Sequence, residues 1–380
     1  MSSSCLVLPA VAQDPGGDDC VEHTIGGADA DGVIRAAEGS LAEYLDRVVD
    51  HRSRQGLRYE LGFLLAVVVA ATACAGHDEV TAQAQWVADA PVWVLTALGA
   101  RPDPLTGAVA RPSEATLRRV LAKVDAADLQ RLGTDWVAAL RAGHHQGGSG
   151  LPAVAIDGKS VRGAATGGNT RPHLLAASTH DDAIVIAQRQ IPDKGSEIGE
   201  LAALVGELDL AGTVVTVDAL HTQRATAEHL AGDTQADYVM TIKANQPRLL
   251  AAAQQALSGP AAEFTEHTEH ARGHGRTEQR VLRAVPVTAE MGIEFPHATQ
   301  LFRVIRYVGG LDGQRRTKEV AHCVTSLTPD RATVPDLGAL LRGHWGAIEN
   351  KIHWVRDTTF NEDASTLRTG TAPQAMAINR

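Results

Sequence analysis

The sequence predicts an α/β protein in which an all-α N-terminal domain precedes a larger α/β domain with a late β-rich insertion. Three observations support this prediction. Residues 40–142 are rich in Ala, Leu and Arg and show no strand-like alternation. Residues 143–150 include four glycines and are typical of a linker. From residue 151 onward, short apolar runs bounded by turn-forming residues alternate with helical segments, as in a sheet covered by helices.

Composition and charge leave most soluble protein classes open. The chain has 380 residues, 44% of them hydrophobic, which suits a globular protein of two or three domains. The net charge of −10 argues against a nucleic-acid partner, but residues 1–50 alone hold ten acids and two bases. Residues 271–320 carry nine Lys and Arg against five Asp and Glu, which leaves room for a basic patch. The four cysteines form no CxxC pair, so no disulfide framework or cysteine-rich zinc site is indicated.

The N-terminal part is predicted to contain a tail followed by helices. Residues 1–39 are rich in Gly, Asp and Ser without periodicity and are expected to be a disordered tail. The longest apolar run, Leu61–Ala75, has 15 residues, fewer than the roughly 20 that a membrane span needs. It predicts a buried helix in a cytoplasmic protein without membrane contact. A helix expected over Ser113–Leu121 is apolar on one side and basic on another, so it suits either packing or DNA contact.

The second domain is predicted from short strands that alternate with helices. Its predicted strands lie at 152–156, 174–178, 183–188, 213–217 and 238–243, with helices over 197–208 and 222–231. The second and third of these strands form a hairpin. Further strands at 278–287, 299–308 and 317–327 give the β-rich insertion at about 260–330, and residues 337–356 return to helix.

Two aspartates occupy matching positions in this domain. Asp157 and Asp218 each directly follow a five-residue apolar strand. Such strand ends lie at the rim of a sheet, where open α/β sheets bind ligands. A single aspartate there is more often a turn-former or a helix cap, so the pair indicates function only if a third ligand exists.

Glu349 is the best candidate for the third ligand. Helical periodicity places it on one face with Trp345, His353 and Arg356, and two of the rare tryptophans flank it in sequence. An ordinary solvated salt-bridge face is the plainer alternative.

Three carboxylates that converge need a counter-charge. Two unit charges about 4 Å apart repel by about 4 kcal/mol at an effective dielectric constant near 20. Either one carboxyl stays protonated or cations neutralise the group. Mg²⁺ suits an all-oxygen site that keeps waters or substrate phosphates as further ligands. Two such ions can activate an attacking water or hydroxyl and stabilise the leaving oxygen without a His or Lys base.

Other motifs do not point to a different site. Residues 157–160, Asp-Gly-Lys-Ser, end like a P-loop, but Ala153 stands where the first glycine is required. His144 and His145 lack further partners at zinc-ligand spacing. Residues 273–276, Gly-His-Gly-Arg, form a basic turn that suits either a phosphate contact or a plain hairpin loop.

Several segments occur together in one order along the chain. In the second domain they are AIDGKSVRG at 155–163, VDA at 217–219 with Thr222-Gln223, IKANQP at 242–247, GHGRTEQR at 273–280, HWGAIEN at 344–350, HWVRD at 353–357, and Glu362-Asp363. In the helical part they are Asp50-His51-Arg52, Gln55-Gly56 and PSEAT at 112–116. In this order and spacing they resemble the ISAs-type insertion-sequence transposases, bacterial members of the DDE transposase superfamily, from about residue 41 to the end.

The resemblance implies an RNase H-like catalytic core over residues 151–380. Asp157 would lie on its first strand, Asp218 after its fourth and Glu349 on a later helix. These three acids would be the catalytic residues and would hold two Mg²⁺ ions, for which Mn²⁺ can substitute. Related transposases carry a Tyr-x2-Arg-x3-Glu-x6-Lys pattern around the glutamate, and here those places hold Arg342, Trp345, Glu349 and Arg356.

The resemblance also implies DNA as the partner, both the element ends and the target. Residues 40–142 would bind the ends, and a homodimer would form in the synaptic complex of a nucleoid-associated protein. The expected DNA contacts are polar or basic residues mostly just beyond strand ends: Lys159, Arg162, Lys243, Asn245, Gln246, Arg276, Asn350 and Arg356.

The function implied is metal-dependent DNA strand cleavage followed by transfer of the 3′-hydroxyl. The family chain continues with another Arg- and Leu-rich helix, so a copy truncated after Arg380 is expected. The alternative is therefore a defective, transposase-derived DNA-binding protein without catalysis. A structure-specific nuclease on the same fold, lacking strand transfer, is a third interpretation.

Overall fold

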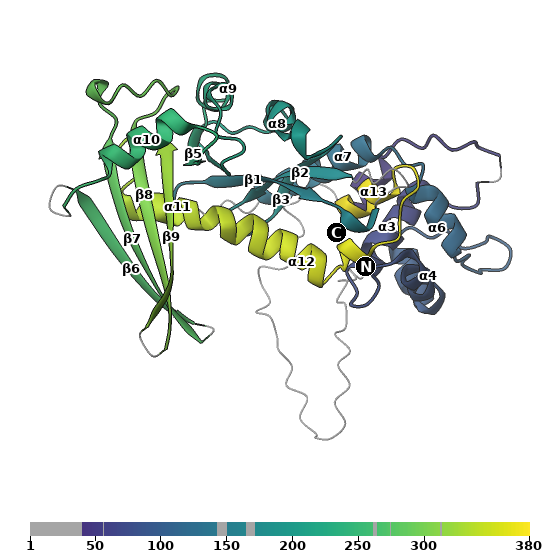
Figure 1. Cartoon of the computed structure of the whole chain (residues 1–380). Helices are drawn as coiled ribbons and strands as arrows, with labels where there is room; N and C mark the ends of the chain where they lie inside the picture. The colour runs from purple at the N-terminus through teal and green to yellow at the C-terminus, as the bar shows by residue number, and fades with distance from the viewer. Residues whose placement is uncertain are drawn as a thin grey trace.

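The computed structural model describes residues 40–55, 57–142, 150–164, 172–260, 264–273, 275–311 and 314–380. Within these ranges the protein is mixed α/β, with helices on both faces of one large sheet (Figure 1). The tail predicted at 1–39 and most of the linker predicted at 143–150 lie outside the described residues. No helix in the described ranges is both long and apolar enough to span a membrane.

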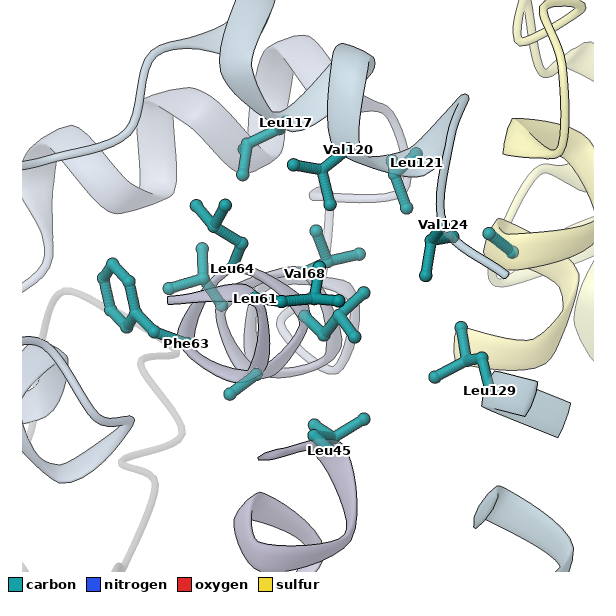
Figure 2. Packing of buried hydrophobic residues seen from close by; sticks show 14 of the residues in the cluster. Leu45, Leu61, Phe63, Leu64, Val68, Leu117, Val120, Leu121, Val124 and Leu129 are labelled. Carbon is teal, nitrogen blue, oxygen red and sulfur yellow. The ribbon is translucent and has the colours of Figure 1, made fainter. Parts of the chain in front are cut away.

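Helices fill the described chain before the first strand. They are α2 (Leu41–Asp46), α3 (Leu61–Thr72), α4 (Val80–Asp89), α5 (Val92–Ala97), α6 (Glu114–Leu121) and α7 (Ala126–Ala142). The buried helix predicted from the apolar run is confirmed, because 10 of the 12 residues of α3 are buried. Its side chains pack against Leu117, Val120 and Leu121 of α6 and against Leu45 and Leu129 (Figure 2).

The end of the chain also belongs to this helical core. α13 (Ala372–Asn379) lies among α3, α6 and α7 (Figure 1). Ala375 and Met376 are fully buried in the same apolar cluster as α3. Their position in the chain had predicted that these residues belong to the second domain.

The sheet has nine strands in the order β3-β2-β1-β4-β5-β9-β8-β7-β6. The first five are β1 (Ala153–Ser160), β2 (His173–Thr179), β3 (Val185–Ile191), β4 (Val214–Val217) and β5 (Asp237–Ile242). β1 is parallel to β4 and antiparallel to β2, and β4 is parallel to β5. The predicted hairpin is confirmed as the antiparallel pair β2–β3.

The insertion extends this sheet as an antiparallel meander. Its strands are β6 (Thr265–Gly273), β7 (Arg276–Pro286), β8 (Gln300–Gly310) and β9 (Arg315–Thr325), and β9 pairs with β5. The three predicted strands are confirmed. β6 was missed because its residues are mostly exposed, so the sequence Thr-Glu-His-Thr-Glu-His lacks an apolar alternation.

Helices cover the two faces of the sheet differently. One face carries α8 (Glu197–Val205), α9 (Arg224–Glu228) and α10 (Pro247–Ala256), whose buried side chains belong to one apolar cluster with Val154 and Ile156 of β1. The other face carries one long helical segment: α11 (Val334–His344), the π-helical η6 (Trp345–His353) and α12 (Trp354–Thr358). This segment confirms the helix predicted over 337–356, and it runs along the sheet from the insertion towards the helical core (Figure 1).

Candidate active site

Asp157 lies inside β1, not after it. Pairing of β1 with β2 continues to Ser160, opposite His173, whereas the parallel pairing with β4 stops at Ile156 opposite Val217. The predicted strand end at residue 156 is therefore wrong, because β2 supplies backbone partners to polar residues that hydrophobicity does not reveal. Asp157 still occupies the position where β1 loses its neighbour β4.

Asp218 directly follows β4, as predicted. Since Ile156 and Val217 are in register, Asp157 and Asp218 occupy corresponding positions on neighbouring parallel strands. One carboxylate oxygen of Asp218 accepts hydrogen bonds from the backbone N–H groups of Leu220, at 2.9 Å, and His221, at 3.4 Å. The turn after β4 therefore fixes the side chain of Asp218 through its own backbone.

Glu349 lies on η6, which packs on β1 and β2. Burial raises the pKa of Asp157 to about 7, and the negative charges of Asp218, Glu197 and Glu349 add to this rise. Asp218 and Glu349 therefore both lie close enough to Asp157 to affect the pKa of its carboxyl. His353, predicted on the same face as Glu349, has Nδ1 at 3.8 Å from Oδ2 of Asp157.

The donor chemistry of this group suits Mg²⁺, but the carboxylates do not form a ready ligand shell. Among the residues that the structure describes, no group of three or more His, Cys, Asp and Glu side chains is arranged to hold a metal ion. The donors of Asp157, Asp218 and Glu349 are all oxygens, which Mg²⁺ prefers. Burial is the largest cause of the raised pKa of Asp157, and a cation would offset the smaller contribution from the neighbouring negative charges.

Glu197 is a fourth acid beside the site that the sequence analysis missed. It is the first residue of α8, is 2% exposed, and lies between His173 and His221. Burial alone would raise its pKa, but hydrogen bonds from the two histidines lower it to about 2. The feature of the sequence that bears on Glu197 is the glycine at position 158. A Cβ at Gly158 would lie 2.5 Å from Oε1 of Glu197.

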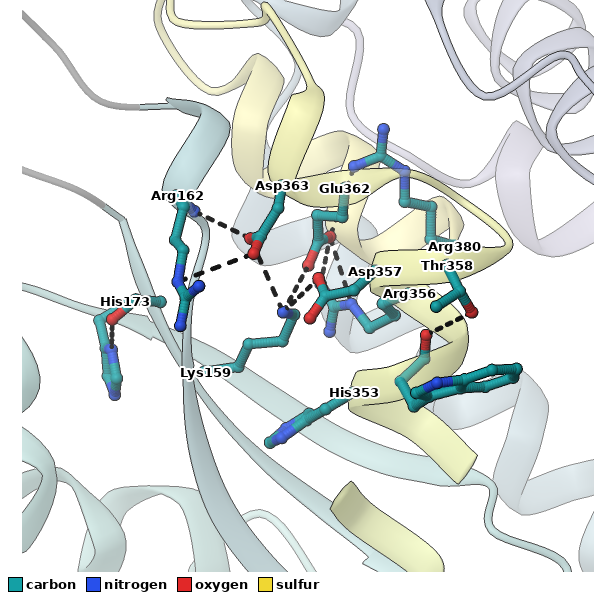
Figure 3. Close-up of polar contacts among 12 residues, drawn as sticks. Lys159, Arg162, His173, His353, Arg356, Asp357, Thr358, Glu362, Asp363 and Arg380 are labelled. Carbon is teal, nitrogen blue, oxygen red and sulfur yellow. Dashed lines mark hydrogen bonds and ion pairs between the residues drawn. The ribbon is translucent and has the colours of Figure 1, made fainter. Parts of the chain in front are cut away.

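Two residues expected to contact DNA are buried in an ionic network instead (Figure 3). Nζ of Lys159 lies 2.6 Å from Oδ1 of Asp357, and the Lys159 side chain is 8% exposed. Arg356 donates to Oε1 of the fully buried Glu362 and to Oε1 of Gln188, both at 2.8 Å. These internal partners and the low exposure of both side chains argue against DNA contact by Lys159 and Arg356.

Asn245 and Gln246 hold the loop that carries Asp218. The side-chain amide of Asn245 donates to the carbonyl of Ala219 at 2.7 Å, and that of Gln246 donates to the carbonyl of Thr222 at 3.0 Å. Lys243, just beyond β5, is exposed. The side chain of Arg162 is 71% exposed and lies 3.7 Å from Asp363. The exposure of Lys243 and Arg162 leaves both side chains accessible to a partner.

A basic groove opens beside Glu349. It has a volume of about 570 Å³ and lies between η6 and the face of the insertion that packs on α11. Towards the base of that face Leu282, Phe302 and Val304 are apolar. Val304 also lines the groove, where it lies among arginines. The lining includes the predicted Arg276 and Asn350 together with Arg280, Arg306 and Arg342, which the sequence analysis did not single out.

Glu278 organises the arginines of this groove. Its side chain is 9% exposed and forms ion pairs with Arg276 at 3.1 Å and Arg306 at 2.8 Å, and also with Arg280. These charges hold the pKa of Glu278 below its usual range, with the hydrogen bond from Arg306 as the largest cause. The guanidinium groups of three arginines thus all contact Glu278 in this groove beside η6.

Sequence comparison finds known relatives of this chain. The chain is 25% identical over 356 residues, 89% of its own length and 84% of the relative's, to "Putative transposase YncI" of Escherichia coli O157:H7. It is 27% identical over 232 residues, 59% and 61% of the two chains, to "H repeat-associated putative transposase YhhI" of Escherichia coli K12.

A solved structure, the piggyBac transposase synaptic complex with hairpin DNA, matches with a TM-score of 0.39 and 10% identity, over 91% of this chain and 70% of that one. Family models match both parts of the chain. The family described as DDE_Tnp_1-associated matches residues 42–137, and the family described as the transposase DDE domain matches residues 148–380. The chain therefore belongs to the transposase DDE domain family.

Proposed function

We propose that this protein is a DNA transposase that cuts DNA strands in a metal-dependent reaction and joins the freed 3′-hydroxyl to target DNA. The observation that carries the proposal is the gathering of Asp157, Asp218 and Glu349 on one face of the sheet. Asp157 on β1, Asp218 after β4 and Glu349 on a later helix match the placement expected of an RNase H-like core. Residues 151–380 would form this catalytic domain.

The three acids would hold two Mg²⁺ ions, with Mn²⁺ as a substitute. Bound there, the ions would activate an attacking water or 3′-hydroxyl and stabilise the leaving oxygen. The protein contributes a fixed Asp218, whose carboxylate is held by two backbone N–H groups. It also contributes the partly buried Asp157, whose carboxyl must lose its proton before both oxygens can act as ligands.

The basic groove beside Glu349 would take the DNA backbone. Phosphodiesters bind guanidinium groups through paired N–H donors, and Arg276, whose side chain is 52% exposed, lines the same groove as Glu349 together with Arg280. A strand lying there would place its phosphates next to the acidic group.

The helical residues 40–142 would recognise the element ends. A second groove, of about 440 Å³, lies beside α6 and is lined by the exposed side chains of Arg58, Arg119 and Lys123. This basic surface supports a DNA-contacting role for the α6 region. Pairing of two ends would require a homodimer, and such a protein would be found on the nucleoid.

The test is cleavage of DNA carrying the element ends, in Mg²⁺ or Mn²⁺. We expect Asp218→Asn and Glu349→Gln to lower the cleavage rate by about 100-fold or more, because each removes a ligand charge from the metal site. Asp209→Asn, in the turn before β4, is the matched control and should cleave like wild type. Salt-dependent DNA binding without any cleavage by wild type would instead favour a non-catalytic DNA-binding protein.

A further inference from the structure

A chain of buried hydrogen bonds runs beneath the two catalytic aspartates. The Ser160 hydroxyl lies 2.8 Å from Nδ1 of His173, and Nε2 of His173 lies 2.6 Å from Oε1 of Glu197. The other oxygen of Glu197, Oε2, lies 3.2 Å from Nε2 of His221. The three central side chains, those of His173, Glu197 and His221, are at most 3% exposed.

This chain joins the elements that carry the two aspartates. Ser160 belongs to β1, three residues after Asp157, and Glu197 belongs to α8 on the opposite face of the sheet from Glu349. The contact is close because Gly158 has no side chain: a Cβ would lie 2.5 Å from both Glu197 Oε1 and His173 Nε2. Glu197 therefore fits directly under the residue that follows Asp157.

At its other end the chain reaches the turn that holds Asp218. The backbone N–H of His221 and that of Leu220 both donate to the carboxylate of Asp218. The imidazole of His221 is fully buried, and Nδ1 has no hydrogen-bond partner among the described atoms. The contact of His221 Nε2 with Glu197 is thus the polar contact that holds this imidazole. It also holds the turn after β4, to which His221 belongs.

We propose that Glu197 is a positioning residue for the metal site: by binding His173 and His221 at once, it fixes the separation of Asp157 and Asp218. The proposal rests on the proposed function, since it assigns these aspartates to a shared cation site. A buried acid with two partners can serve stability alone. The positioning role adds a distinct expectation, that loosening His221 weakens metal binding while the protein remains folded.

The experiment measures Mn²⁺ binding to the full chain by calorimetry, with the Mn²⁺-induced rise in melting temperature as a second readout. We expect His221→Ala to weaken Mn²⁺ binding by about tenfold or more, as for other residues that orient metal ligands. His221→Gln should regain most of the affinity, because its amide N–H can reach the same oxygen of Glu197. If the two residues act as a unit, adding Glu197→Gln to His221→Ala should cost little more.

The control is His229→Ala, which removes a histidine whose Nδ1 lies 2.9 Å from Asp233 and which should leave Mn²⁺ affinity unchanged. The proposal would be overturned if His221→Ala bound Mn²⁺ as tightly as wild type. It would also be overturned if His221→Gln bound Mn²⁺ as weakly as His221→Ala. Should His221→Ala fail to fold, Glu197→Asp carries the test, because it keeps the charge but shortens the reach. Unchanged Mn²⁺ affinity in that variant would overturn the proposal equally.

DNA cleavage then separates this inference from the proposed function. His221→Ala should cleave more slowly at saturating DNA while binding DNA without metal as tightly as wild type. If His221→Ala lost DNA affinity without metal by as much as it lost cleavage rate, the effect of His221 would not be confined to the metal site. Wild-type protein that binds Mn²⁺ but never cuts DNA would refute the proposed function alone, because the comparison of variants is read from metal binding.

Discussion

Asp157 is a partly buried acid, 19% exposed, whose neighbours are also acids. Burial, with the charges of Asp218, Glu197 and Glu349, raises its pKa to about 7, whereas an aspartate in an unfolded chain titrates at about 3.9. Between these two pH values the folded protein binds a proton that the unfolded chain has lost. Its stability therefore falls as the pH rises, by up to about 1.4 kcal/mol per pH unit from this one group.

Replacing Asp157 with asparagine should remove this penalty. In the absence of divalent metal, we expect Asp157→Asn to melt at a higher temperature than wild type at pH 8. The difference should shrink as the pH falls from 7 towards 4, because wild type then regains its proton. Melting curves over this range check the prediction, and a difference that does not vary with pH would contradict it. Mg²⁺ should stabilise wild type more than the variant.

Residue chemistry alone could not separate DNA contacts from internal partners. Lys159 and Arg356 are a lysine and an arginine near the candidate acids, and these residue types bind phosphate. Their internal partners include Asp357 and Glu362. Both acids lie far from Lys159 in sequence and contact it only in the folded chain. Glu197 was missed for the same reason, since its histidine partners lie 24 residues away on either side.

At the scale of elements, Glu362 connects three parts of the structure. It lies in η7 (Glu362–Ala364), pairs with Arg356 of α12 at 2.8 Å and with Arg380, just after α13, at 3.4 Å. Nζ of Lys159 on β1 lies 4.0 Å from its other oxygen (Figure 3). The network thus ties the strand of Asp157 to the helical segment of Glu349 and to the C-terminal helix.

Breaking this network should destabilise the whole protein. We expect Glu362→Ala to lower the free energy of unfolding by about 3–5 kcal/mol, because it leaves buried guanidinium groups without their counter-charge. Urea unfolding measures the effect. The matched control is Glu207→Ala, which removes the exposed partner of Arg189 and should change stability much less. Equal losses in the two variants would contradict the importance of the buried network.

Periodicity predicted the helix of Glu349 but not its winding. The π-helical stretch η6 keeps Glu349 and His353 towards the site, while Arg356, in the α-helical turn that follows, enters the interior. The prediction at 3.6 residues per turn placed Arg356 on the same face as Glu349 and His353. In the structure Arg356 points away from that face. The hydrogen-bond pattern that makes a helix π-wound has no local sequence signature here.

At the scale of the molecule, DNA binding should depend on salt through the basic groove. Each phosphate contact contributes about 0.9 to the slope of log affinity against log salt concentration. We expect Arg276→Ala, at the mouth of the groove, to weaken binding to any DNA sequence and to reduce this slope by about one. Binding isotherms at several salt concentrations check this.

A basic residue outside the groove serves as the control for that measurement. Arg331 pairs with Asp237 at the start of β5 and does not line the groove beside Glu349. Arg331→Ala should keep both the affinity and the salt slope of wild type. A slope that falls equally in the two variants would show that net charge, not the groove, governs DNA binding.

The sequence by itself determined most of the elements, though not β6, and singled out Asp157, Asp218 and Glu349 as candidates. Apolar strands that end near Asp157 and Asp218, and the helix of Glu349, were readable because burial leaves a periodic pattern in the chain. Only the tertiary structure decided which charged side chains face solvent and which are internal, and that α13 completes the first helical core. Pairing between distant residues depends on the packing of whole elements, and no local pattern records it.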